Sequence, residues 1–181
     1  MAFSISYEIL LWNKLVQFFE GINKDSAHSH GKSDSSKINW HILLADDDDD
    51  DRMFFSDAIT TIAPSVKLTE AINGDDLINI LKRNDFHLPD LIFLDLNMPY
   101  KNGLECLKEI RSTDILKNIP ILIYSTSVNR DHVDISYLNG ANMYIQKPVS
   151  YDGIKRILKT IFSVNPMDWF HQPPREKFIL K

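Results

Sequence analysis

Side chains that could bind a metal ion and a phosphoryl group come directly after four short apolar runs of the sequence. They are Asp46 and Asp47 after the first of these runs, Asp95 after the second, Ser125 and Thr126 after the third, and Lys147 after the fourth. Three neighbouring carboxylates repel one another, and at least one of them would be protonated unless a cation lay among them. Oxygen ligands of this kind suit Mg²⁺, which keeps several waters and commonly pairs with phosphate.

A lysine and a hydroxyl beside such a metal would bind the remaining oxygens of a phosphoryl group. An aspartate that faces both Mg²⁺ and a lysine can act as a covalent nucleophile and form an acyl phosphate. Catalysis would then consist mainly of positioning and charge neutralisation. The combination predicts phosphoryl transfer to an aspartate, and it is more specific than any one of its members.

Short apolar runs and helical patterns alternate along the chain from Ile38 onward. Strands are expected at residues 42–45, 66–71, 91–94, 121–124 and 143–145. Helices are expected near residues 51–63, 74–83, 103–112, 130–139 and 150–162, because apolar residues recur there at i, i+3 and i+4. This alternation indicates an α/β fold with a doubly wound, five-stranded parallel sheet covered on both faces. Ligands of such sheets bind beyond the carboxyl ends of the strands, where the polar side chains would lie.

The run of six aspartates, Asp46–Asp51, has two expected parts. Asp46 and Asp47 belong to the metal site, and Asp48 is expected to point away from it. The last three aspartates lie at the start of the first helix, where capping and the macrodipole favour negative charge. So much negative charge at one point predicts that removal of Mg²⁺ lowers the stability of the fold.

The composition is that of an ordinary globular chain with one local concentration of charge. The 181 residues suffice for about one domain with terminal extensions, and the net charge is −5. Without the aspartate run, 20 basic residues would face 19 acidic ones, so the rest of the chain is close to neutral. This balance does not indicate a nucleic-acid partner. The single cysteine, Cys106, excludes an internal disulfide framework and fits a reducing, cytoplasmic compartment.

The chain divides by pattern into four segments, at residues 1–22, 23–37, 38–163 and 164–181. The first could form an amphipathic helix that packs on its own domain, associates with a partner or a second copy as in a dimer, or lies on a membrane surface. Its internal charges argue against a secretory signal and against a membrane span. The second is rich in Ser, Asn, Asp and His, which is typical of a linker. The third is the domain itself, and the aromatic residues of the C-terminal tail are expected to pack on that domain or on a partner; they are Trp169, Phe170 and Phe178.

Four segments of this domain resemble the signature segments of response-regulator receiver domains of two-component signalling. They are ILLADD, LIFLDLNMP, PILIYSTS and GANMYIQKP, and the resemblance covers roughly residues 38–163. It implies a flavodoxin-like (βα)₅ sheet in the order 2-1-3-4-5 and a single-domain receiver of the chemotaxis type. It also implies a phosphorelay function, in which a histidine kinase or a histidine phosphotransfer protein supplies the phosphoryl group. The output would be contact with a downstream protein or onward relay of the group.

The resemblance implies a phosphoacceptor and a set of metal ligands. Asp95 would accept the phosphoryl group and, before phosphorylation, would pair with Lys147. Asp47 would ligate Mg²⁺ directly and Asp46 would help to hold it through water. Asp95 itself and the backbone carbonyl of Asn97 would complete the ligands that the protein provides.

The resemblance also implies a set of switch residues. Lys147 would contact a phosphoryl oxygen, and the peptide bond between Lys147 and Pro148 would be cis. Ser125 would supply the switch hydroxyl, with the backbone N–H of Thr126 beside it. Tyr144 matches the aromatic residue whose rotamer reports the state of the domain.

Three other interpretations of the same residues are open. A charged surface loop would leave the polar residues at the other strand ends unexplained. An aspartyl-phosphate phosphohydrolase would need a second carboxylate where this chain has Asn97, and it would need a substrate cap. A receiver-fold interaction module that is never phosphorylated would not need the acceptor, the acidic pair and the lysine together. We therefore expect no enzymatic activity beyond the domain's own phosphotransfer and autodephosphorylation.

Overall fold

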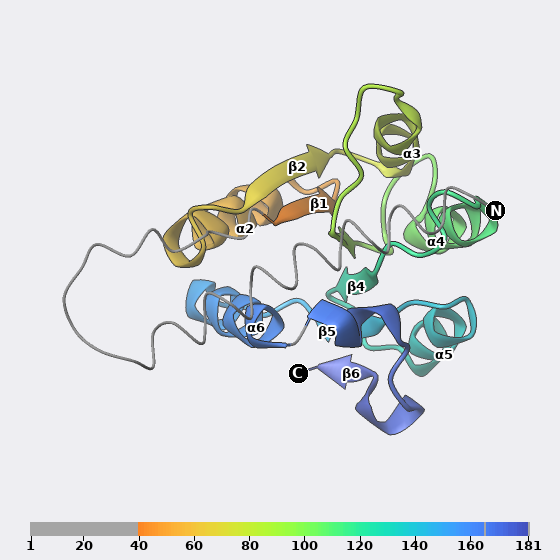
Figure 1. Ribbon diagram of the computed structural model, residues 1–181. Helices are drawn as coiled ribbons and strands as arrows, with labels where there is room; N and C mark the ends of the chain where they lie inside the picture. The colour runs from red at the N-terminus through yellow and green to blue at the C-terminus, as the bar shows by residue number, and fades with distance from the viewer. Residues whose placement is uncertain (1–39, 165, 181) are drawn as a thin grey trace, which may run out of the picture. The chain divides into compact units, whose positions relative to one another are not determined.

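A computed structural model describes residues 40–164 and 166–180 of the chain, and strands alternate with helices throughout most of this part (Figure 1). The strands are β1 (His41–Ala45), β2 (Lys67–Ala71), β3 (Leu91–Leu94), β4 (Ile121–Ser125), β5 (Met143–Gln146) and β6 (Ile179–Leu180). The helices are α2 (Asp49–Ile62), α3 (Gly74–Lys82), α4 (Gly103–Ser112), α5 (Arg130–Leu138) and α6 (Tyr151–Ser163). Two short 3₁₀ helices follow, η1 (Pro166–Phe170) and η2 (Arg175–Lys177).

All of these strands lie in one parallel sheet with the order β2-β1-β3-β4-β5-β6. The predicted order 2-1-3-4-5 is therefore confirmed, and each predicted strand and helix begins and ends within about two residues of its observed bounds. The five-stranded prediction was one strand short, because β6 extends the sheet beyond β5. Two residues are too few to show a strand period in the sequence.

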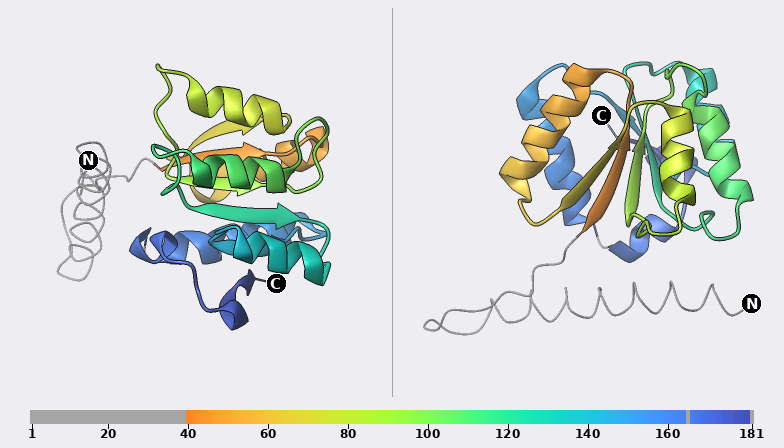
Figure 2. Two further views of the ribbon diagram at one scale, coloured as in Figure 1. Left: turned by 90° about the vertical axis from the view of Figure 1, so that its right-hand side faces the viewer. Right: turned by 90° about the horizontal axis from the view of Figure 1, so that it is seen from above.

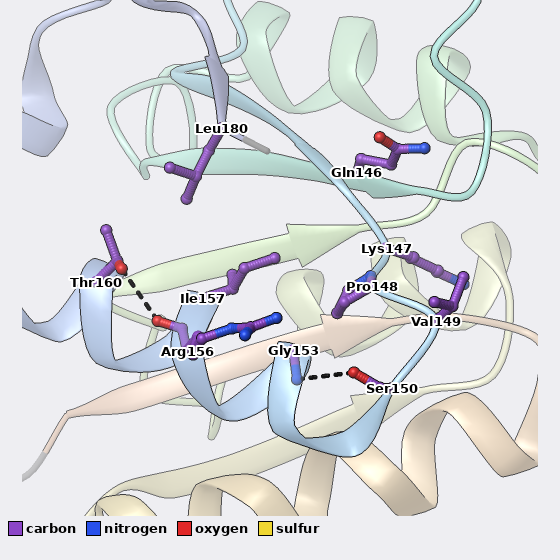
Figure 3. Close-up of a pocket in the computed structure, with 10 residues that line it drawn as sticks. All are labelled: Gln146, Lys147, Pro148, Val149, Ser150, Gly153, Arg156, Ile157, Thr160 and Leu180. Atoms are coloured by element: carbon purple, nitrogen blue, oxygen red, sulfur yellow. Dashed lines mark hydrogen bonds between the residues drawn. The ribbon is translucent and has the colours of Figure 1, made fainter.

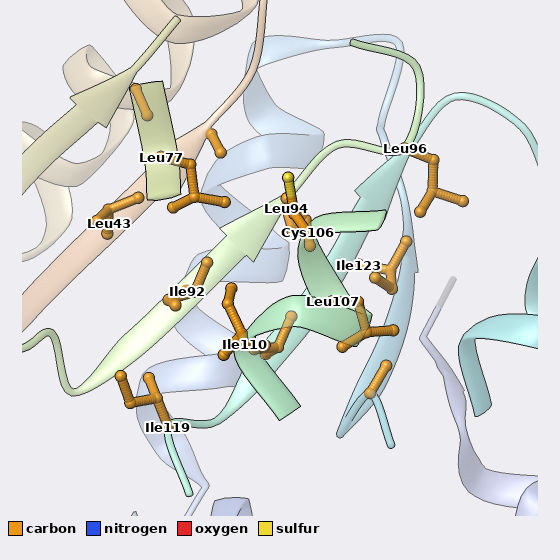
Figure 4. Packing of buried hydrophobic residues seen from close by; sticks show 14 of the residues in the cluster. Leu43, Leu77, Ile92, Leu94, Leu96, Cys106, Leu107, Ile110, Ile119 and Ile123 are labelled. Carbon is orange, nitrogen blue, oxygen red and sulfur yellow. The ribbon is translucent and has the colours of Figure 1, made fainter. Parts of the chain in front are cut away.

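The sheet is covered on both faces, as parallel sheets require. Helices α2 and α6 lie on one face, and α3, α4 and α5 lie on the other (Figures 1 and 2). Alternate side chains of β1 supply the two cores: Ile42 and Leu44 pack with α2 and α6, while Leu43 packs toward α3 and α4. Figure 4 shows the second of these cores, where Leu43 meets leucine and isoleucine side chains of β3, α3 and α4.

The C-terminal tail packs on the domain, and two of its aromatic side chains are buried there. Trp169 is 4% exposed and Phe178 is completely buried. The backbone N–H of Tyr144 in β5 donates to the carbonyl of Phe178 over 2.8 Å, and the side-chain amide of Asn142 donates to the carbonyl of Trp169 over 2.6 Å. The tail therefore belongs to the same compact unit as the preceding residues, which begins at Trp40.

The expectations for residues 1–22 and 23–37 lie outside the described residues. Within the part that the structure does describe, no helix has both the length and the apolar character needed to cross a bilayer.

Candidate functional site

Three carboxylates meet at the carboxyl ends of β1 and β3. These strands are neighbours, with Ala45 opposite Leu94, and the backbone N–H of Asp95 donates to the carbonyl of Ala45 over 2.9 Å. This pairing places Asp46 and Asp47 beside Asp95, and one oxygen from each of the three lies within 4.8 Å of the others. The chain passes from β1 to β2 on one side and returns to β3 on the other, so the cluster lies at the topological switch point of the sheet.

Asp46 is the most deeply buried carboxylate of the cluster. Its side chain is buried, and burial raises the pKa of this carboxyl to about 6, although Lys147 opposes the shift. Its Oδ2 atom is buried without a well-aligned hydrogen-bond donor. A buried carboxylate oxygen beside two further carboxylates is a donor set that fits a hard divalent cation.

Asp95 is held with its carboxyl group facing the same rim. It is 6% exposed, and its Oδ1 accepts a hydrogen bond of 2.7 Å from the backbone N–H of Leu96. Burial raises the pKa of Asp95, while the charge of Lys147 and the backbone N–H groups of Leu96 and Asn97 act in the opposite direction. Asn97 itself is exposed next to the cluster.

Lys147 reaches the cluster from the end of β5, and it has three carboxylate neighbours. Its Nζ lies 2.7 Å from Oδ2 of Asp46, 2.7 Å from Oδ2 of Asp51 and 3.6 Å from Oδ2 of Asp95. The predicted pairing with Asp95 is thus present, but two carboxylates lie closer. Burial works against the charge of this lysine, but Asp46 and Asp51 outweigh burial and raise the pKa of Lys147 above its usual value.

The predicted switch residues lie near one another on β4 and β5. Ser125 is completely buried at the end of β4, whereas Thr126 is exposed. The ring of Tyr144 is buried, and its hydroxyl donates to the carbonyl of Ser127 over 2.5 Å. The backbone N–H of Lys147 donates to the carbonyl of Ser125 over 2.9 Å, which holds the ends of β4 and β5 together.

One predicted feature of the site is wrong. The Lys147–Pro148 bond was expected to be cis, but no peptide bond among the described residues is cis. The trans isomer remains the lower in free energy for an X–Pro bond, by about 0.5–1 kcal/mol, unless the surroundings enforce the other. Lys147 reaches the carboxylates with the bond in the trans form.

Asp51 and Arg52, in the first turn of α2, contact the site but were not predicted as site residues. Asp48 caps this helix by accepting from the backbone N–H groups of Asp50 and Asp51, which matches the expectation that it points away from the cluster. The cap sets the next turn so that Asp51 faces Lys147, while Arg52 donates to the backbone carbonyl of Asp46 over 2.7 Å. The only sequence signal for Asp51 and Arg52 was their position about one helical turn after the aspartates that were predicted to bind metal.

A groove of about 500 Å³ has Lys147 in its lining (Figure 3). Its lining includes Lys147 and Pro148 after β5, Arg156 and Ile157 of α6, and Leu180 of β6. Lys147 therefore borders both the acidic cluster and this groove.

The family model of the response regulator receiver domain matches residues 42–159 of the chain. The chain is 31% identical over 124 residues to the chemotaxis protein CheY-3 of Vibrio cholerae, which covers 68% of this chain and 92% of that protein. It is 42% identical over 76 residues to the response regulator Rcp1 of Synechocystis, which covers 42% of this chain and 47% of Rcp1. Other relatives are longer: the chain spans about half the length of the probable C4-dicarboxylate response regulator DctR of Bacillus subtilis, to which it is 29% identical.

Two solved structures are similar to this one in fold and in sequence. The phosphorylated cyanobacterial phytochrome response regulator RcpA superposes with a TM-score of 0.63 at 31% identity, over 68% of this chain and 91% of that one. The Mn²⁺-bound form of Rcp1 superposes with a TM-score of 0.64 at 29% identity, over 75% of this chain and 97% of that one.

Proposed function

The chain belongs to the response regulator receiver domain family, and on this premise we propose that Asp95 is the residue that accepts its phosphoryl group. A receiver domain is a signal-transducing part of a two-component system. The proposal is carried by one observation: Asp46, Asp47 and Asp95 converge at the switch point of the sheet, with the buried ammonium of Lys147 beside them.

The proposed reaction is transfer of a phosphoryl group from a phosphohistidine. A carboxylate oxygen of Asp95 attacks the phosphorus, so that a P–O bond forms while the P–N bond breaks. The imidazole of the donor keeps the electron pair of the broken bond and takes a proton from water. Lys147 holds one phosphoryl oxygen by its ammonium group, and the hydroxyl of Ser125 with the backbone N–H of Thr126 binds the others.

The divalent cation is proposed to be Mg²⁺, held by Asp46, Asp47, Asp95 and the backbone carbonyl of Asn97. When bound, Mg²⁺ neutralises the charge that the carboxylates and the phosphoryl oxygens bring together. The Mn²⁺ in the solved form of Rcp1 supports a divalent cation in a related domain. The buried Oδ2 of Asp46, whose close neighbour Lys147 is shared with Asp51 and Asp95, supports the same assignment in this chain.

The proposed output is a change of surface next to the site. Phosphorylation adds about −1.5 to −2 charge at Asp95, which draws Ser125 and Lys147 toward it. Tyr144 then gives up its hydrogen bond to the carbonyl of Ser127 and repacks, which changes the face formed by α5, β5 and α6. The partners would be a histidine kinase or a histidine phosphotransfer protein as donor and a downstream protein as target, in the cytoplasm.

A test of the proposal uses phosphoramidate, a small donor with the same P–N bond. The full chain is incubated with phosphoramidate and Mg²⁺, and its intact mass is measured. We expect the mass to increase by one phosphoryl group in the wild type, and not in Asp95→Asn or in the presence of EDTA. No gain in the wild type, or an equal gain in Asp95→Asn, would refute the assignment.

The comparisons favour this function over an aspartyl-phosphate phosphohydrolase. The family model spans the whole site, and the residue two positions after Asp95 is the amide Asn97 and not a carboxylate that could act as an acid or base.

A further inference from the structure

Asp51 contacts Lys147 as closely as Asp46 does, yet the proposed reaction gives it no role. Its Oδ2 accepts a hydrogen bond of 2.7 Å from the ammonium of Lys147, across 96 residues of sequence. Asp95, the proposed acceptor, lies at 3.6 Å from the same nitrogen, which is beyond hydrogen-bonding distance. The lysine is therefore held at the cluster but off the acceptor.

The ammonium of Lys147 has enough donors to contact both the aspartates that hold it and a phosphoryl group on Asp95. An ammonium group has three N–H donors and no acceptor. Asp51 takes one of them in a hydrogen bond, and Asp46 draws the ammonium in an ion pair. Since Asp51 and Asp46 engage at most two of the three donors and Asp95 accepts none, at least one donor is available to an oxygen carried by Asp95.

Asp51, unlike Asp46, contacts Lys147 without belonging to the three converging carboxylates. Asp46 is one of the three carboxylates whose oxygens converge, and Asp51 is not. Its contact with Lys147 therefore does not compete with the metal-binding set. Asp51 is also firmly placed, because it lies in the first turn of α2 and its backbone N–H donates to the capping carboxylate of Asp48 over 3.2 Å.

We propose that Asp51 is a positioning residue for phosphoryl transfer: it holds the ammonium of Lys147 at the rim, so that the lysine meets the phosphoryl group and does not close onto the free carboxylate of Asp95. This inference rests on the proposed function. It assigns Asp51 no contact with the phosphoryl group itself, and its effect is exerted through Lys147.

The test measures the affinity of the full chain for beryllofluoride, a phosphoryl mimic, by calorimetry at saturating Mg²⁺. Asp51→Asn removes the charge that binds Lys147 and keeps the size of the side chain. Asp50→Asn is the matched control: Asp50 lies in the same helical turn and its backbone N–H is also capped by Asp48, but its carboxylate is exposed and makes no ion pair within the described part of the chain. A third variant, Asp51→Glu, restores a carboxylate with one more methylene.

We expect Asp51→Asn to bind beryllofluoride about three- to tenfold more weakly, since a charge-assisted hydrogen bond at a partly exposed site is lost. Asp50→Asn should stay within about twofold of the wild type, because it changes only the long-range charge. Affinity for Mg²⁺ alone, measured in the same way, should decrease equally in the two variants, and Asp51→Glu should recover most of the loss.

Three results would overturn the inference. Equal affinities for the mimic in Asp51→Asn and Asp50→Asn would show that only charge matters. Tighter binding in Asp51→Asn would show that Asp51 competes for the lysine. A loss of Mg²⁺ affinity as large as the loss of mimic affinity would show that the metal site, and not the lysine, was disturbed. If the wild type neither binds the mimic nor takes phosphoryl from phosphoramidate, the proposed function fails, and that outcome is distinct from the other three.

Discussion

The electrostatics of the site depend on which carboxylates lie closest to the ammonium of Lys147. Lys147 is shared among Asp46, Asp51 and Asp95, and the first two hold it more closely than the third. Asp46 is the most buried of these carboxylates and shows a raised pKa in spite of its cationic neighbour. One lysine is therefore not enough to stabilise the charge of the cluster, which leaves a cation as the natural further partner.

The raised pKa of Asp46 gives a prediction about stability in the absence of metal. The folded pKa is about 6, compared with 3.8 for the unfolded chain, so folding favours the protonated form. The resulting stability is present at low pH and is lost as the pH rises through 6. Asp46→Asn, which is neutral at every pH, should therefore be more stable than the wild type at pH 7.5 by about 1–3 kcal/mol, and the difference should vanish near pH 4.

Urea unfolding in EDTA at the two pH values measures this difference. A variant that is less stable than the wild type at pH 7.5 would contradict it, because the contact with Lys147 would then outweigh the cost of burial.

Removal of the metal should also lower the stability of the wild type. A ligand present at 100 times its dissociation constant stabilises the fold by about 2.7 kcal/mol. We expect millimolar Mg²⁺ to raise the melting temperature of the wild type and to have little effect on Asp47→Asn, since Asp47 is one of the three converging carboxylates. A melting temperature that does not respond to EDTA in the wild type would argue against a metal site.

The helices hold these residues in place by contacts with the strand ends. Gly103, the first residue of α4, packs directly against the backbone of Asp95 and Leu96: a Cβ atom there would overlap the carbonyl oxygen of Asp95. Its backbone N–H donates to the carbonyl of Leu96 over 3.0 Å. This close approach of helix to loop fixes the segment that carries Asp95, the proposed phosphoacceptor.

Gly103→Ala should therefore be destabilising by about 2 kcal/mol or more, because the overlap is with backbone and a flexible side chain cannot relieve it. It should also slow phosphorylation by displacing Asp95. Chemical denaturation and the phosphoramidate assay measure the two effects. Lys108→Ala, at an exposed position of the same helix, is the control and should change the stability by less than about 0.5 kcal/mol. A Gly103→Ala variant as stable as this control would show that the loop can move aside.

The sequence predicted the strands and helices well, and it predicted that Asp46, Asp47 and Asp95 lie together, for a physical reason. Buried parallel strands have continuous apolar sequences, such as Leu91–Leu94. Because parallel strands all run in the same direction, the residue that follows each strand lies at the same edge of the sheet. The pairing of Asp51 with Lys147 was missed because it depends on the rotation of α2, which the cap at Asp48 sets in three dimensions. The trans bond before Pro148 was missed because the isomer depends on tertiary surroundings.

The C-terminal tail adds the last strand, β6, to the sheet. β6 covers the edge that β5 would otherwise expose, and an uncovered edge strand is a site for unwanted pairing. The ring of Phe178 lies against Tyr137 of α5 and Tyr144 of β5, with centroid distances of 5.0 and 6.4 Å. The tail therefore contacts the aromatic residue that is proposed to respond to phosphorylation.

Phe178→Ala should be destabilising by about 3–5 kcal/mol, the usual cost of removing a fully buried phenylalanine. Lys177→Ala, at the exposed neighbouring position, should have almost no effect. Thermal and urea unfolding of both variants test whether the tail is part of the fold. A Phe178→Ala variant with the stability of the wild type would mean that the tail adds little to the domain.

We propose that Asp95 is the phosphoacceptor among four neighbouring aspartates, Asp46, Asp47, Asp51 and Asp95. The most direct measurement traps the acyl phosphate chemically: the full chain is phosphorylated with acetyl phosphate and Mg²⁺, reduced with borohydride, digested, and the reduced residue is located by peptide mass. We expect a single reduced residue, at position 95. Reduction at Asp46, Asp47 or Asp51, or no reduced residue at all, would contradict it.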